Sequence, residues 1–389
     1  MASNTQALVH SNIAAGTMRV SQQPTAAAIE FSPCGQLIAW VGRINDRATL
    51  EVKNRCTRQQ VFSELLPCPF GQHSAKSEFG WAHTLEWSHN SRFLTLTCPW
   101  GIFAADLASR VMRRLFCSGS SGGSCIWAPS ATILAVNYHP DPYQSLLSLY
   151  NSSGTELHIA QQLTRRRIMR TFWAADSRAL AIQGESDICI LSISGEDQVQ
   201  CRLPYPGIAG TGVVAWSPLT WDCPHLLCIA CSGEALFFDC KAALKGKCED
   251  PLQGEVVWAS YMTWVQNGVA VITDKYSLGN ATIRLFDVRS GSSGLLLESR
   301  LQLSMPSVYS FAPSPDQAHL CMMQCKHAPG IDANTLVLLN VVSGSQALIR
   351  LPEHLSRNPQ PRWTSSGYSL AVPLVMEDSF LYKIFSYVL

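Results

Sequence analysis

The chain has 389 residues, of which 47% are hydrophobic and 15% charged, and its formal net charge is +1. This composition is that of a folded globular protein and excludes a disordered chain, and no run of about 18 apolar residues predicts an integral membrane protein. The charge balance also lacks the basic excess of most nucleic-acid-binding domains, which argues against nucleic acid as the main partner.

Residues 1–16 precede the first recurring pattern, and we expect them to form an N-terminal extension without the long apolar core of a secretory signal. Fifteen cysteines are spread along the chain. Some, such as Cys189 and Cys321, fall in apolar strand-like runs, where free cysteine behaves as a small hydrophobic residue. The odd count, in a chain too large to need disulfides, favours a reducing compartment (cytoplasm or nucleus) over import into an organelle.

One sequence unit recurs along the remaining chain. Each copy has a short alternating run, a turn of small residues and then an apolar strand, as in AIEFSPCGQLIAWV and SCIWAPSATILAVN. The alternating runs end, in chain order, at Phe31, Trp87, Trp127, Trp173, Trp216, Trp264, Pro313 and Trp363. These positions are 40 to 56 residues apart, and a four-stranded propeller blade takes about 40–50 residues. We therefore interpret the eight positions as structural repeat positions that pack between sheets.

A further apolar strand follows each pair, as in LYNSSG, LFDVRSG and LLNVVSG. It ends in Asp, Asn or Ser before a glycine-containing turn, and these residue types favour turn conformations.

These units resemble WD repeats. Phe286-Asp287 and Phe238-Asp239 stand where the family has its Trp-Asp dipeptide, and Ser32-Pro33 matches its Ser-Pro-Asp-Gly turn. The resemblance covers residues 17–389 and implies an all-β fold: a single closed β-propeller of four-stranded blades. Eight blades are favoured, and seven remain possible if the unit at Pro313 or Trp363 is assigned wrongly. The family's Gly-His dipeptide is essentially missing and no unit has a true Trp-Asp, so no subfamily is assigned.

The last unit supplies three strands, near Trp363, 369–372 and 380–387. We predict that residues 17–23 supply its fourth strand, because such pairing removes the exposed edges at both ends of the chain.

Two segments exceed the length that a blade needs. The connection at about 54–83 carries Phe70, Phe79 and Trp81, so it is either one outer strand with local packing or an insertion that contacts a partner. The second segment, 241–255, mixes a short helical turn with polar residues, and we interpret it as a surface connection. The apolar spacing of the helical turn is found in 240–247 (CKAALKGK).

No residue set points to catalysis, a cofactor or a metal. Residues 119–123 match the G-x-S-x-G pattern of hydrolases but lead into a strand, whereas a nucleophile elbow needs a following helix. Cys228 and Cys231 form a C-x-x-C, but residues three apart in a strand point to opposite faces and do not chelate zinc.

A cluster of basic residues, Arg165, Arg166, Arg167 and Arg170, precedes the unit at Trp173. It is either a solvated strand edge or a site that contacts acidic protein, RNA or anionic lipid. WD-repeat resemblance implies a non-catalytic scaffold that binds several protein subunits of one assembly. The alternatives are a hydrolase or small-molecule binder that uses the central channel, and RNA or lipid binding through these arginines.

Overall fold

The computed structural model describes residues 15–19, 28–44, 47–66, 84–98, 101–116, 123–141, 144–160, 168–184, 187–194, 197–203, 213–217, 225–229, 234–239, 243–248, 258–266, 268–275, 280–291, 294–306, 308–324, 335–350, 362–363, 369–376 and 379–386. Within these residues every regular element is a β-strand, and the strands form eight four-stranded sheets. The predicted all-β fold class is confirmed. The described part of the chain holds no helix with the length and hydropathy to span a membrane.

The chain divides into two compact units, and the larger one comprises residues 25–264 and 287–299. Residues 25–264 contain five sheets whose strands are hydrogen-bonded in chain order. They are β2 (Ala28–Phe31), β3 (Leu37–Ile44), β4 (Arg47–Asn54) and β5 (Gln60–Leu65); β6 (Thr84–Trp87), β7 (Phe93–Cys98), β8 (Gly101–Asp106) and β9 (Val111–Phe116); β10 (Gly123–Trp127), β11 (Ile133–Asp141), β12 (Gln144–Asn151) and β13 (Glu156–Ala160); β14 (Ile168–Trp173), β15 (Ala179–Gly184), β16 (Ile188–Ser194) and β17 (Asp197–Arg202); β18 (Val213–Trp216), β19 (His225–Ile229), β20 (Ala235–Asp239) and β21 (Leu244–Cys248).

The smaller unit comprises residues 1–24, 265–286 and 300–389. It holds a sheet of β26 (Val308–Pro313), β27 (His319–Gln324), β28 (Thr335–Asn340) and β29 (Gln346–Arg350), and a sheet of β30 (Arg362–Trp363), β31 (Ser369–Met376), β32 (Ser379–Ser386) and β1 (Ala15–Arg19). The remaining sheet, β22 (Trp258–Val265), β23 (Gly268–Lys275), β24 (Asn280–Gly291) and β25 (Gly294–Pro306), contributes residues to both units.

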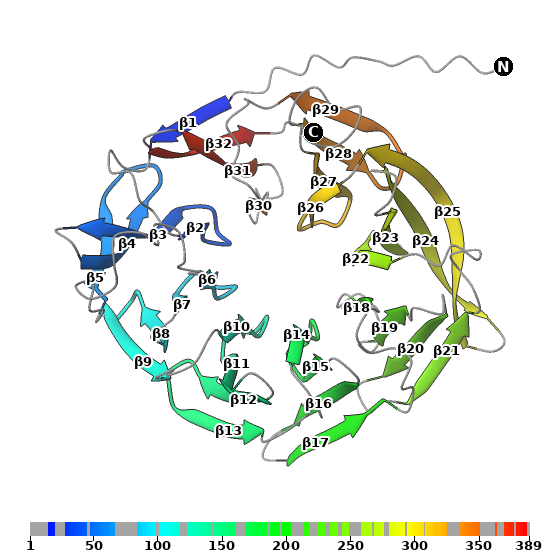
Figure 1. The fold of residues 1–389 in the computed structure, drawn as a ribbon, viewed down its shortest axis with the longest axis horizontal. Helices are drawn as coiled ribbons and strands as arrows, with labels where there is room; N and C mark the ends of the chain where they lie inside the picture. The colour runs from blue at the N-terminus through cyan, green and yellow to red at the C-terminus, as the bar shows by residue number, and fades with distance from the viewer. Residues whose placement is uncertain are drawn as a thin grey trace. The chain divides into compact units, whose positions relative to one another are not determined.

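The two ends of the chain share one sheet. Strand β1 pairs antiparallel with β32, from Ala15 opposite Phe385 to Arg19 opposite Leu381, and Figure 1 shows blue β1 beside red β32. The N-terminal strand therefore completes the last sheet, as predicted. Its bounds differ: the strand begins at Ala15, inside the expected extension, and only residues 17–19 of the predicted 17–23 belong to it.

The second strand of a sheet is the most deeply buried. Strands β7, β15 and β27 are buried at every residue. Each is hydrogen-bonded on both edges and buried on both faces, so neither face of the strand meets water. Cys321 in β27 and Cys189 in the third strand β16 are fully buried cysteines outside any disulfide and pack as small apolar residues.

The two over-long segments contain strands. Residues 60–65 form β5, whose Phe62 packs in the core, while Phe70, Phe79 and Trp81 lie outside the described residues. The helical turn expected in 240–247 is wrong, because residues 244–248 form β21 and pair with β20. Pairing with a neighbouring strand overrides the weak helical spacing of a short segment.

Candidate functional site

The tryptophans at the repeat positions are structural. Each stands at or next to the end of the first strand of its sheet, where Trp87, Trp173, Trp216 and Trp264 are buried. The Trp87 Nε1–H donates to the carbonyl oxygen of Glu30 at 3.3 Å, and Glu30 immediately precedes Phe31, the repeat position of the preceding sheet.

The same hydrogen bond recurs in other sheets. Each indole reaches the carbonyl of the residue before the preceding repeat position: Trp173 to Ile126 (3.1 Å), Trp216 to Phe172 (2.9 Å), Trp264 to Ala215 (3.2 Å) and Trp363 to Ala312 (3.0 Å). These bonds join neighbouring sheets within each unit. The indoles therefore have a structural role and are not available to bind a ligand.

Trp127 is the exception. Its Nε1 is buried with no hydrogen-bond partner among the described residues. The carbonyl that the pattern assigns to it, that of Glu86, instead accepts a hydrogen bond from the Thr95 hydroxyl at 3.1 Å. The Trp127 ring stacks on Phe93, with ring centroids 5.3 Å apart. Packing therefore holds this indole where hydrogen bonding holds the others.

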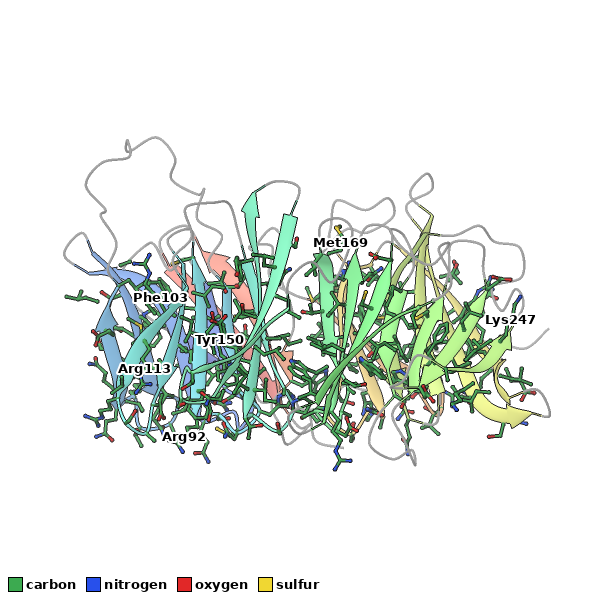
Figure 2. The ribbon with its side chains drawn as sticks, turned by 90° about the horizontal axis from the view of Figure 1, so that it is seen from below. Arg92, Phe103, Arg113, Tyr150, Met169 and Lys247 are labelled. Carbon is green, nitrogen blue, oxygen red and sulfur yellow. The ribbon has the colours of Figure 1, made fainter. Side chains whose placement is uncertain are left out.

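The predicted partner-binding residues fall largely outside the described residues, which exclude Arg165, Arg166 and Arg167 as well as the three aromatic residues of 54–83. Arg170 lies on β14 and is exposed. Met169 beside it is 53% exposed and stands at the upper end of the sheets in Figure 2.

The opposite end of the sheets of the larger unit carries tight turns. In an antiparallel sheet, the turn between the first and second strands and the turn between the third and fourth lie at the same end. We call these the first and last turns of a sheet. In the first turn of β2–β5, the Ser32 hydroxyl accepts from the Leu37 N–H at 3.0 Å, and Ser88 and Phe93 repeat the contact at 2.8 Å. The Cys34 N–H donates to the Ser91 hydroxyl at 2.9 Å, which joins the first turns of two neighbouring sheets.

The last turns share one geometry in three sheets. The first turn residue is Asn54, Asp106 or Asn340, and its Oδ1 accepts the N–H of the residue two positions on. The backbone then passes through positive φ at the fifth residue, with φ of 59° at Arg58, 55° at Arg110 and 72° at Gly344. An L-residue in this region costs about 1–2 kcal/mol, a cost that glycine does not incur. Two neighbouring sheets thus place an arginine where the same turn elsewhere has glycine.

Arg92 belongs to the same end of sheet β6–β9. Its Nε donates to Asp106 Oδ1 at 3.0 Å and its second guanidinium nitrogen donates to Oδ2 at 2.9 Å, so one arginine grips both oxygens of a carboxylate. The hydrogen bond from Arg92 lowers the pKa of Asp106 to about 2. Asp106 therefore stays charged at every physiological pH.

Two more arginines extend from β9. The Arg113 guanidinium donates to the Ser153 carbonyl in the last turn of β10–β13, and Figure 2 shows Arg92 and Arg113 toward the end opposite Met169. Arg114 lies over the Phe103 ring at 5.7 Å. We define the basic turn patch as Arg55, Arg58, Arg92, Arg110 and Arg113, all on two neighbouring sheets of the larger unit.

Comparison with known proteins decides the fold. Solved structures that resemble the chain include the WD40 domain of SCAP from fission yeast, with a TM-score of 0.59, 12% identity, and coverage of 96% of this chain and 98% of that one. The chain has the WD40 β-propeller fold. The Cps50 (Swd1) β-propeller domain of Myceliophteria thermophila is also similar, with a TM-score of 0.51, 14% identity, and coverage of 97% and 99%. No family model matches the chain, and no curated protein matches it in sequence.

The basic turn patch of this WD40-type propeller is absent from the sequence prediction, which singled out Arg165–Arg170. A signal for it was present. The repeat's third strand ends in Asn or Asp, and the turn that follows closes on glycine in NVVSG but on arginine in NRCTR and DLASR. Only the equivalence of the three turns, visible in their hydrogen bonds, shows that arginine there occupies a glycine conformation.

Proposed function

We propose that the chain is a non-catalytic protein-interaction scaffold, a subunit of a multiprotein assembly. The observation that supports the proposal most directly is that the core aromatic residues and the exposed turn residues have different roles. Five of the repeat-position tryptophans are hydrogen-bonded between neighbouring sheets and form part of the frame, whereas turns and strand ends present exposed charged and apolar side chains. Rigid scaffolds that display variable loops are suited to binding. The fold by itself does not assign a function, so the proposal depends on these surfaces.

One contact surface that we propose is the arginine cluster Arg165, Arg166, Arg167 and Arg170. Met169 and Arg170 are both exposed at the start of β14, and methionine and arginine are enriched in interface cores. The aromatic residues Phe70, Phe79 and Trp81 are a second proposed contact. Exposed free thiols at Cys34 and Cys56 suit the reducing compartment, cytoplasm or nucleus, that we propose for the protein.

Gentle affinity purification of the tagged full-length chain, followed by mass spectrometry, tests the scaffold proposal. We expect a stoichiometric set of protein partners. The triple variant R165E/R166E/R167E should lose at least one partner while its thermal unfolding stays unchanged. A chain that purifies alone would contradict the scaffold function. If the triple variant keeps every partner, the arginine cluster is not a contact surface of the scaffold.

A further inference from the structure

Arg58 and Arg110 occupy equivalent last turns of neighbouring sheets in an unfavourable backbone conformation. Strained residues of this kind concentrate at functional sites, where the surrounding structure holds them in place. Both side chains are exposed, and within the described residues neither has an acidic partner. The fold therefore holds two exposed arginines whose charges have no acidic partner in the part of the chain that the structure describes.

The surroundings of these two arginines are basic. No Asp or Glu occurs in the neighbouring turn residues 32–36, 55–59, 88–92, 107–110, 128–132 or 152–155. Asp106 borders the patch, but Arg92 already occupies both of its carboxylate oxygens. The two sheets are joined by the Cys34–Ser91 and Trp87–Glu30 hydrogen bonds and share one hydrophobic cluster, so their turns are held side by side.

We propose that the basic turn patch (Arg55, Arg58, Arg92, Arg110 and Arg113) docks an extended acidic segment of a partner protein. This inference deepens the scaffold function and rests on it. Arginine is suited to gripping carboxylates with two parallel hydrogen bonds, and Arg92 and Asp106 show that geometry within the patch. Arg58 and Arg110 offer the same donors to carboxylates from outside.

A polypeptide suits the patch better than a nucleic acid. Single-stranded nucleic acids are held by aromatic stacking as well as by charge, and the six turn segments contain no Phe, Tyr or Trp. Val111, next to Arg110 in the sequence, is 42% exposed and offers an apolar contact beside the basic residues. An acidic segment with an occasional apolar side chain complements this combination.

The test uses the full-length chain and a fluorescent peptide of alternating Glu and Leu residues, with affinity measured by anisotropy at low salt. The variant R58G/R110G removes both charges and gives each turn the residue its backbone favours. We expect affinity to fall about two- to thirtyfold, the range for two exposed ion pairs. The melting temperature should rise by about 1–3 °C, because the strain is relieved. Weaker binding by a more stable protein is not explained by unfolding.

The matched control R178Q/R350Q has the same net charge but keeps the patch, so it should bind the peptide like the parent chain. The variant R58K/R110K keeps both charges but loses the paired donors of arginine, so its affinity should lie between that of the parent chain and that of R58G/R110G. Equal weakening in R58G/R110G and R178Q/R350Q, or no binding by the parent chain, would overturn the proposal.

Binding of a poly-U RNA, measured in the same assay, tests the alternative that the patch binds nucleic acid. Tighter binding to RNA than to the peptide, lost in R58G/R110G, would assign the patch to phosphate and overturn the acidic-peptide proposal. Failure of the peptide assay alone leaves the scaffold function standing, because co-purification of partners tests that function separately.

Discussion

Single residues show how degenerate repeats still join their sheets. The repeat tryptophans donate to a carbonyl at one fixed position of the preceding sheet, although the sequence around them varies. A buried indole N–H is costly to leave unpaired. Thr95 takes the carbonyl of Glu86, and Trp127 is left with packing alone. At this position packing against Phe93 holds the indole, and no hydrogen bond from Trp127 to the preceding sheet is formed among the described residues.

The substitutions Trp173→Phe and Trp127→Phe separate these contributions. Both remove similar ring volume, but only Trp173→Phe removes a hydrogen bond. We expect Trp173→Phe to lower the free energy of unfolding by about 1 kcal/mol more than Trp127→Phe does. Urea unfolding followed by circular dichroism measures the difference. Equal losses would show that the indole hydrogen bonds add nothing to stability beyond packing.

At the scale of the element, the close approach of two strands restricts which residue types can stand at the contact. Gly246 lies on β21, where an added Cβ would stand 2.2 Å from the carbonyl oxygen of Leu295 on β25. Two backbones meet there without room for a side chain, and this accounts for a glycine within a strand. The helical preference of residues 240–247 is weak, and this close contact together with the pairing of β21 with β20 overrides it.

Gly246→Ala should therefore destabilise the protein by about 2–3 kcal/mol, the upper part of the range for an overpacked site. The clash is with backbone atoms, which a side-chain rotation does not relieve. Lys245→Ala, on the same strand, is the control. The Lys245 end of its salt bridge to Asp239 is exposed to solvent, so its effect should stay within about 1 kcal/mol. Differential scanning calorimetry measures both, and a Gly246→Ala variant as stable as the parent chain would rule out the close approach.

At the scale of the whole molecule, the pairing of β1 with β32 ties residues near one end of the chain to residues near the other. Without β1, the edge of β32 presents unpaired backbone groups. Its sequence, SFLYKIFS, is mainly apolar with one charge, which is typical of an edge that associates with other chains.

Deletion of residues 1–19 should lower the melting temperature and promote self-association, because β32 then loses its partner. Deletion of residues 1–14 keeps β1 and is the control. Size-exclusion chromatography with light scattering, together with thermal unfolding, distinguishes the two variants. If both deletions behave alike, the terminal pairing contributes nothing to stability.

The sequence by itself determined the all-β class, the repeat, the placement of Trp87 and its equivalents at strand ends, and the terminal strand near Thr17. These features follow from the alternation of apolar and polar residues, from apolar runs and from turn residues. Such patterns predict structure wherever residues close in sequence determine it. Only the tertiary structure decided that Trp127 lacks an acceptor, that residues 244–248 form a strand, and that Arg58 and Arg110 stand in a glycine conformation. Each of these depends on backbone geometry or on a partner distant in sequence, which local patterns do not encode.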